Sequence, residues 1–161
     1  MNTVLKDEPD DAKQYLTFRL GGEEYAVGIL TVQEIRGWAP VTAIPHSPRE
    51  MLGVINLRGV VVPIVDLRLK FALERADYNE FTVVIILNVG ARVAGIVVDG
   101  VSDVITLTAD QIRAAPALGR DADTDHIVGF GTLEERMRII LDVERLLANL
   151  GDTCNSNGVL K

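Results

Sequence analysis

The chain has 161 residues, of which 48% are hydrophobic, and its 16 basic and 23 acidic side chains give a formal net charge of −7. A nucleic-acid-binding protein needs clustered lysine and arginine to displace counterions, so this balance argues against DNA or RNA as a partner. The polar N-terminus shows no secretion signal, and no apolar run reaches the roughly 18 residues of a membrane span. A single cysteine excludes an intrachain disulfide. We therefore expect a cytoplasmic protein without direct membrane insertion.

Short apolar runs separated by turn residues dominate the chain and predict a mostly β protein. The expected strands are Tyr15–Leu20, Glu23–Val27, Met51–Leu57, Val60–Val65, Thr82–Leu87, Ala91–Val98, Val101–Leu107, Ile127–Leu133 and Met137–Leu141. Turn signals between consecutive runs predict hairpins, and Asp99-Gly100 is the strongest of these signals. Many short strands with few helices are typical of antiparallel barrels or a sandwich.

The corner Arg58-Gly59 predicts a hairpin tip that holds an arginine beside two apolar strands. Gly59 can supply the positive φ that a tight corner needs. Pro63 interrupts the second strand, and proline has no N–H to give to a ladder. We therefore expect that strand to lie at a sheet edge or to contain a bulge. A tip of this kind, beside backbone that is not fully paired, is suited to recognition.

Two aspartates, Asp66 and Asp142, each follow an apolar run and predict the caps of short helices. The first helix would carry Leu67 and Phe71 at helical spacing. The second would present a longer apolar face, which consists of Val143, Leu146, Leu147 and Leu150.

The capped segments Ile64–Leu67 and Ile140–Val143 follow one pattern and are 76 residues apart. Earlier segments also resemble each other: the hairpin FRLGGEEYAV is followed by VQEI, and the hairpin IILNVGARVAG is followed by VSDV. This repeat predicts two tandem β-barrels within residues 14–150, at about 14–72, with the C-terminal helix packing back, and at about 78–142. Thr82–Leu87 is apolar on both faces, so the sister barrel should cover its outer face. Residues 1–13 and 151–161 are polar and are expected to be disordered tails.

The chain lacks the residue patterns of common catalytic, cofactor and metal sites, so we expect none of these. His46 is interpreted as a loop residue and His126 as a structural one. The run Asp121–Asp125 has the alternating oxygens of a calcium loop, but His126 and Thr132 stand where that loop needs glycine and glutamate. A binding module is therefore expected. An enzyme would need a pocket of ionisable groups, and a nucleic-acid-binding barrel would need a basic stripe with exposed aromatic residues.

Over roughly residues 14–150 the chain resembles the CheW family of bacterial chemotaxis coupling proteins. The motifs that carry the resemblance are FRLGGEEYAV, ILTVQEIRG, GVINLRGVVVPIVDLR, DYNEFTVVIILN, RVAGIVVDGVSDVI and LTADQIR. The resemblance implies an all-β fold of two SH3-like five-stranded β-barrels packed around an apolar inter-barrel groove.

The same resemblance implies an adaptor that supports kinase activation in receptor arrays. Its partners would be the cytoplasmic tips of methyl-accepting chemotaxis receptors and the regulatory domain of the histidine kinase CheA, and it would be recruited to membrane-associated receptor clusters. The alternative is an isolated CheW-like regulatory domain of a CheA-type kinase or of a related signalling pathway. No kinase domain accompanies the expected barrels, which favours the adaptor.

The resemblance also implies the residues that couple receptor and kinase. They are Val32, Glu34, Ile35, Gly53, Asn56, Arg58, Val83, Gly95, Val101 and Val104. From pattern alone, the valines and Ile35 could equally be core residues. We expect Arg58 to pair with Glu34 across neighbouring strands and so to give the binding surface a fixed shape.

Overall fold

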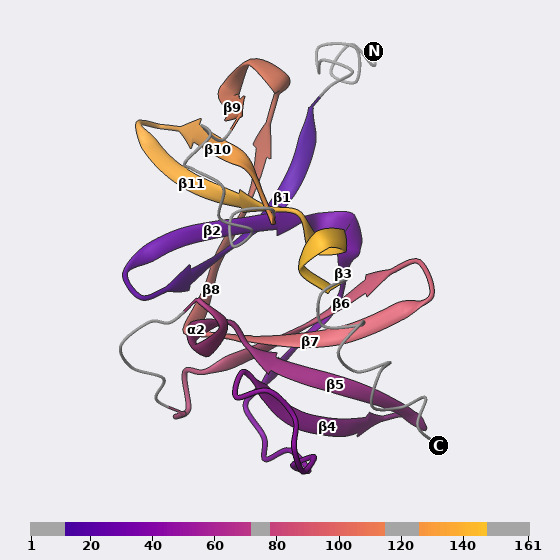
Figure 1. The fold of residues 1–161 in the computed structure, drawn as a ribbon. Helices are drawn as coiled ribbons and strands as arrows, with labels where there is room; N and C mark the ends of the chain where they lie inside the picture. The colour runs from indigo at the N-terminus through magenta and orange to yellow at the C-terminus, as the bar shows by residue number, and fades with distance from the viewer. Residues whose placement is uncertain (1–11, 72–77, 115–125, 148–161) are drawn as a thin grey trace.

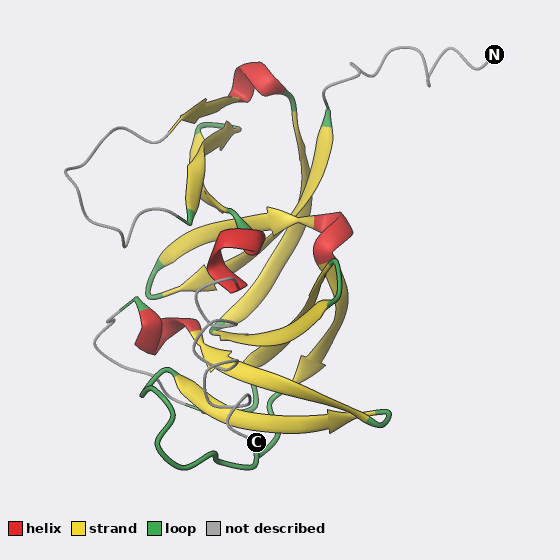
Figure 2. Cartoon of the chain, turned by 45° about the vertical axis from the view of Figure 1, so that its right-hand side comes forward, coloured by secondary structure: helices red, strands yellow, loops and turns green. Residues whose placement is uncertain are grey.

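The computed structural model describes residues 12–71, 78–114 and 126–147, and these ranges are mostly β (Figures 1 and 2). The strands are β1 (Lys13–Leu20), β2 (Glu23–Gly28), β3 (Val32–Gly37), β4 (Met51–Leu57), β5 (Val60–Asp66), β6 (Val83–Val89), β7 (Arg92–Val98), β8 (Gly100–Leu107), β9 (Ile112–Ala114), β10 (Ile127–Leu133) and β11 (Arg136–Leu141). The short helical elements are η1 (Ile29–Thr31), α2 (Leu67–Lys70), η2 (Ala109–Gln111) and a helix at 143–147. The expected all-β class is confirmed.

The strands form two curled sheets of the SH3-like barrel type, which occupy the upper and lower parts of Figure 1. Barrel A has the strand order β8-β1-β2-β11-β10-β9, and barrel B has the order β3-β6-β7-β5-β4. Barrel B has the expected five strands. Barrel A has a sixth, because the three residues of β9 add to the edge of β10.

The two barrels do not follow each other along the chain, so the expected division at about 14–72 and 78–142 does not match the strand pairing. Each barrel takes a hairpin from one half of the chain and the remaining strands from the other half. The hairpin β1–β2 joins β8, β10 and β11, whereas the hairpin β6–β7 joins β3, β4 and β5. This exchange is reciprocal, and equivalent strands occupy equivalent places in the two barrels. The predicted repeat is therefore confirmed, but its halves are intertwined.

The prediction of a hairpin at Asp99-Gly100 is wrong. Strand β7 ends in barrel B, and β8 pairs with β1 in barrel A, so these residues form a crossover between the barrels. Neither residue has the positive φ of a tight two-residue hairpin. The hairpins at Gly21-Gly22 and Arg58-Gly59 are confirmed, and all four of these residues have positive φ.

Pro63 was expected to mark either an edge strand or a bulge. The first alternative is wrong, because β5 has a neighbour on each side. The β4–β5 pair does contain a register shift, but it lies on β4, between Met51 and Gly53. Pro63 pairs with Val54 of β4 on one side. On the other side, the parallel ladder to β7 begins only at Ile64. Proline is tolerated here because its position lies just outside that ladder.

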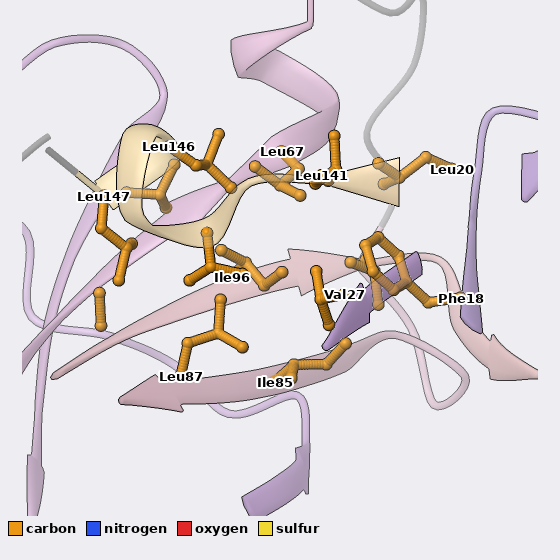
Figure 3. Packing of buried hydrophobic residues seen from close by; sticks show 14 of the residues in the cluster. Phe18, Leu20, Val27, Leu67, Ile85, Leu87, Ile96, Leu141, Leu146 and Leu147 are labelled. Carbon is orange, nitrogen blue, oxygen red and sulfur yellow. The ribbon is translucent and has the colours of Figure 1, made fainter. Parts of the chain in front are cut away.

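The largest core cluster lies between the barrels and is called here the inter-barrel cluster. It consists of Leu16, Phe18, Leu20, Val27, Met51, Val65, Leu67, Ile85, Leu87, Ala94, Ile96, Val98, Leu141, Val143, Leu146 and Leu147. Figure 3 shows most of these side chains, which converge from both sheets and from the helix at 143–147. Burying one aliphatic side chain contributes roughly 1.5–3 kcal/mol, so this cluster holds the barrels together.

Strand β6 supplies both the inter-barrel cluster and the interior of its own barrel. Ile85 and Leu87 lie in the inter-barrel cluster, whereas Val84 and Ile86 lie in a separate cluster inside barrel B. The prediction that a sister barrel covers the second face of this strand is confirmed. The covering barrel contains β1 and β2, the N-terminal hairpin.

Both predicted helix caps are present. Asp66 accepts a hydrogen bond from the Arg68 backbone N–H, and Asp142 accepts one from the Arg145 backbone N–H. The helix at 143–147 packs its buried leucines into the inter-barrel cluster. Leu150 lies outside the described residues.

Candidate interaction surface

Strand β8 is the edge of the barrel A sheet, and two of its valines face the inter-barrel cluster. The β1–β8 register places Val104 opposite Leu16 and Val101 opposite Phe18. Residues directly opposite each other in an antiparallel pair share one face of the sheet. Because Leu16 and Phe18 are buried in the cluster, Val101 and Val104 lie at the margin of that cluster.

Strand β3 is the edge of the barrel B sheet and offers a matching set. Val32 lies opposite Leu87, and Ile35 lies opposite Ile85. Val83 lies two residues from Ile85 along β6, so it shares the face of Ile35 as a diagonal neighbour. These residues form the barrel B margin of the same cluster.

We call these five residues, Val32, Ile35, Val83, Val101 and Val104, the inter-barrel rim. Val32, Val83 and Val101 are partly buried and pack against the cluster. Ile35 is 47% exposed and Val104 is 44% exposed. The five predicted apolar contact residues therefore border the same cluster, from two different sheets. Sequence alone could not have shown this, because they come from strands of different barrels.

Leu30 extends the apolar surface and was missed by the sequence reasoning. Its side chain in η1 is almost fully exposed. It lies beside a surface hollow of about 560 Å³ whose other lining residues include Tyr15, Ile29 and Thr106. The only signal in the sequence was that Leu30 belongs to an apolar segment between two strands.

The predicted pair of Arg58 and Glu34 is present, with 2.7 Å between Arg58 Nη2 and Glu34 Oε1. The two residues do not come from neighbouring strands, because β3 and the β4–β5 hairpin lie at opposite edges of the barrel B sheet. Curvature brings these edges together, and a hollow of about 270 Å³ lies between them, lined by Arg36 of β3 and Val54 of β4 among others. The ion pair therefore bridges the seam of barrel B.

Asn56 stabilises the hairpin tip that presents Arg58. Its side-chain Oδ1 accepts a hydrogen bond of 2.8 Å from the Gly59 backbone N–H. Both tip residues have positive φ, 52° at Arg58 and 91° at Gly59. This is the turn geometry that matches the twist of a two-residue hairpin, and an arginine adopts it at a cost. The tip is therefore held in shape by Asn56 and by Glu34.

The two predicted glycines, Gly53 and Gly95, are both buried and cannot contact a partner directly. A Cβ on Gly95 would lie 2.6 Å from Ile64 Cδ1 inside barrel B. A Cβ on Gly53 would lie 2.1 Å from the Thr42 carbonyl oxygen. We interpret both glycines as packing positions whose replacement would act through the shape of barrel B.

The histidines match their predicted roles. His126 is buried, and its ring stacks on Phe71 with 5.0 Å between the ring centroids. His46 is exposed in the loop before β4. Asp121–Asp125 lies outside the described residues. Within the described ranges, no group of three or more His, Cys, Asp or Glu side chains could hold a metal ion. No helix among the described residues is long and apolar enough to cross a membrane.

Comparison with known proteins shows the family of this chain. The CheW-like domain family matches residues 14–151. The chemotaxis protein CheW of Klebsiella aerogenes is 56% identical over 137 residues, which cover 85% of this chain and 82% of that protein. A probable chemotaxis protein CheW of Rhizobium etli is 38% identical, covering 92% of this chain and 96% of that protein.

A solved structure has the same fold. The crystal structure of the scaffolding protein TtCheW from Thermoanaerobacter tengcongensis superposes with a TM-score of 0.74 at 30% identity. The match covers 80% of this chain and 88% of that protein. The family match spans nearly all of the described strands, and the relatives match over most of their own length. The chain belongs to the CheW family of chemotaxis scaffolding proteins.

Proposed function

We propose that this protein is an adaptor that couples methyl-accepting chemotaxis receptors to the histidine kinase CheA and supports kinase activation at membrane-associated receptor clusters. The observation that carries the proposal is the inter-barrel rim, a set of apolar residues from β3 and β6 of barrel B and from β8 of barrel A that border one cluster. Family membership supports the chemotaxis context, because the relatives are named as chemotaxis proteins and the solved relative as a scaffolding protein.

The inter-barrel rim is proposed as the docking surface for the receptor. Ile35 and Val104 present exposed aliphatic groups, and Leu30 adds another beside its hollow. An α-helical hairpin presents ridges of apolar side chains that such a margin can accommodate. The partly buried Val32, Val83 and Val101 would then form the floor of the contact.

Arg58 and Glu34 are proposed to position this surface. The pair lies on the surface, and exposed ion pairs contribute only about 0.2–1 kcal/mol to stability. Glu34 lies next to Ile35 on β3, so the pair anchors the strand that carries one exposed residue of the inter-barrel rim. Its contribution would therefore be to the shape of the binding surface more than to the free energy of unfolding.

A second surface is needed for the kinase, and the two barrels offer equivalent candidates. Val61 of β5 and Met137 of β11 occupy equivalent positions in the repeat, and both are exposed on strands of the two similar hairpins. We propose that one of these outer faces meets the kinase regulatory domain. When one partner is bound, the other is held near its own binding surface at a high effective concentration. Two contacts of modest affinity can therefore support a stable array.

The test is reconstitution with a purified receptor signalling fragment and purified CheA. The wild-type chain should form a ternary complex and stimulate kinase autophosphorylation. Ile35→Glu and Val104→Glu should each weaken receptor binding, because a charge at the margin must be desolvated on docking. Val128→Glu is the matched control, since Val128 is 46% exposed and lies on β10, a strand that carries no residue of the inter-barrel rim.

The proposal fails if the wild-type chain binds neither component. The assignment of the inter-barrel rim fails separately if Val128→Glu weakens receptor binding as much as the two variants at the rim do. Circular dichroism and thermal unfolding should show that all three variants are folded.

A further inference from the structure

A buried charged cluster joins barrel A to barrel B at the end of β5. The guanidinium of Arg68 contacts Asp66 through two hydrogen bonds, Nε to Oδ1 at 3.0 Å and Nη2 to Oδ2 at 3.1 Å. Its Nη1 donates to Asp99 Oδ1 at 2.8 Å. Arg68 and Asp66 are both buried, whereas Asp99 is partly exposed.

The cluster is continuous from one barrel to the other. Asp66 ends β5, and Arg68 belongs to α2, so both are attached to barrel B. Asp99 lies in the crossover from β7 to β8. Its Oδ2 accepts a 2.8 Å hydrogen bond from the Gly21 N–H in the β1–β2 turn, and its backbone N–H donates to the Arg19 carbonyl at 3.0 Å. Arg68 therefore reaches barrel A through Asp99.

Tyr78 and Trp38 brace the cluster on the barrel B side. The Tyr78 hydroxyl donates to Asp66 Oδ2 at 2.5 Å, and the Tyr78 ring lies 5.0 Å from the Arg68 guanidinium carbon. Trp38 stacks on Tyr78 with 4.5 Å between ring centroids. Burial by itself would lower the pKa of Arg68, but hydrogen bonds and charges from Asp66 and Asp99 outweigh burial and raise this pKa. The Arg68 guanidinium therefore stays charged in the ionic link between the barrels.

The internal repeat allows the two places equivalent to this link to be compared. The 76-residue offset between the capped helices makes Glu144 the equivalent of Arg68 in the second half. The segments VQEI and VSDV are offset by 69 residues, which makes Leu30 the equivalent of Asp99 in the first half. Glu144 and Leu30 are both exposed. The fold thus has two equivalent places for an ionic link between the barrels, and only one of them has it. Buried ion pairs are weak contributors to net stability compared with apolar packing, although removal of one partner leaves the other charge buried and is destabilising. Their better attested use is to select one geometry.

We propose that Arg68 is a positioning residue that fixes the orientation of the two barrels and thereby the spacing of the edge strands β3 and β8. Four of the five residues of the inter-barrel rim lie on these two strands, and Val83 lies on β6 beside β3. An apolar cluster is non-directional and permits small rotations of one barrel on the other. The fork of Arg68 is held by Asp66 of barrel B and by Asp99 of the crossover, which is itself hydrogen-bonded to barrel A. This contact has a defined direction and removes that freedom.

The geometric test measures the distance between spin labels on the two barrels by pulsed electron resonance. Labels are attached to cysteines at the exposed positions Val61 in barrel B and Thr132 in barrel A, in a Cys154→Ser background. Arg68→Met removes the fork and retains much of the side-chain length. We expect the distance distribution to shift or broaden relative to the chain with Arg68 intact.

Arg138→Met is the matched control for loss of a buried arginine. Arg138 is buried, and its Nε donates to Glu24 at 3.1 Å, but it joins β11 to β2 within barrel A. This variant should unfold more easily and keep the wild-type distance distribution. The proposal is overturned if Arg68→Met leaves the distribution unchanged, or if Arg138→Met changes it as much. If Arg68→Met does not fold, Asp99→Asn, which keeps the side-chain shape and weakens the link, serves in its place under the same criteria.

The consequence for binding rests on the proposed function. Arg68→Met should lower affinity for the receptor fragment by about 2- to 30-fold, the range expected for coupling between distant sites, whereas Arg138→Met should not. A changed label distance with unchanged receptor affinity would refute the connection to the inter-barrel rim. Failure of the wild-type chain to bind the receptor would refute the proposed function, while the label distances would still decide the role of Arg68.

Discussion

Gly53 and Gly129 lie 76 residues apart, one in each barrel, and at both positions a backbone carbonyl occupies the space of a Cβ. The Thr42 oxygen would lie 2.1 Å from a Cβ on Gly53, and the Arg113 oxygen would lie 2.3 Å from one on Gly129. Both glycines adjoin a register shift in their hairpins. In each barrel the missing side chain lets another segment pair with the strand that contains the register shift: Thr42 pairs with β4, and β9 pairs with β10. The two halves therefore share this detail of construction.

Replacement of Gly53 by alanine should destabilise the protein. The new Cβ would collide with the Thr42 carbonyl, and the φ of +151° is unfavourable for alanine. Forced overpacking of this kind costs about 1–3 kcal/mol. Urea unfolding should show this loss, together with weaker protection of the Val54 amide from hydrogen exchange, because that amide donates to Thr42.

Gly28→Ala is the control for the Gly53 variant. Nothing lies within 4 Å of a Cβ at Gly28, and its φ is negative. Its free energy of unfolding should stay within about 0.5 kcal/mol of wild type. Equal destabilisation by the two substitutions would contradict the close-approach explanation.

Gly95→Ala should destabilise barrel B, and Ile64→Val should partly compensate. The added methyl would meet Ile64 Cδ1 at 2.6 Å, whereas valine lacks that atom. Ile64→Val alone should cost about 0.5–1.5 kcal/mol. In a double-mutant cycle monitored by denaturant unfolding, the double variant should lose less free energy of unfolding than the sum of the losses in the two single variants. Additive losses would show that the Ile64 contact does not determine the cost.

Arg58→Ala should change the free energy of unfolding by less than about 1 kcal/mol while weakening receptor binding. Arg58→His should behave in the same way, because a neutral imidazole cannot replace the guanidinium fork. Arg145→Ala is the control, since Arg145 is 66% exposed and Arg58 is 68% exposed, and both pair with a carboxylate. Calorimetric titration with the receptor fragment should separate the two sites. Wild-type affinity in Arg58→Ala would remove the positioning role.

Tyr78 should contribute stability that is lost at high pH. Burial, followed by the hydrogen bond and charge of Asp66, raises the pKa of Tyr78 from 10.0 to about 12. Because the folded-state pKa is raised, the stabilisation is complete below pH 10 and disappears as the pH rises towards 12. Tyr78→Phe should therefore lose less stability than wild type between pH 10 and 12. Parallel pH profiles of urea unfolding for the two proteins would contradict this expectation.

Local patterns predicted the individual strands well. Met51–Leu57 and Ile127–Leu133 begin and end at the predicted residues, because alternating or continuous apolar runs between turn residues constrain strands strongly. The same patterns misled at Asp99-Gly100, where a hairpin signal turned out to be a crossover. There the Asp99 carboxylate is occupied by Arg68 and by the Gly21 amide, and these partners are distant in sequence.

The residues of the candidate surface were predicted, but their relative positions in the fold were not. Val32 and Val101 could be named from their motifs, whereas their common position depends on β3 and β8 being the edges of different sheets. The burial of Gly53 and Gly95 was likewise hidden. A glycine in a strand pattern indicates that something approaches closely, but only the packing shows that Thr42 and Ile64 are what approach.

The amino-acid order by itself determined the all-β class, the two capped helices and the duplication, because these depend on hydrophobic period, turn chemistry and repeated pattern. Only the tertiary structure decided that the repeats exchange hairpins. The strands pair in the way that buries both faces of β6 and β7. Which pairing achieves this burial depends on the packing of the whole chain. The exchange places β6 beside β3 and β1 beside β8. The inter-barrel rim has residues on both barrels, so its geometry depends on how the barrels are held together.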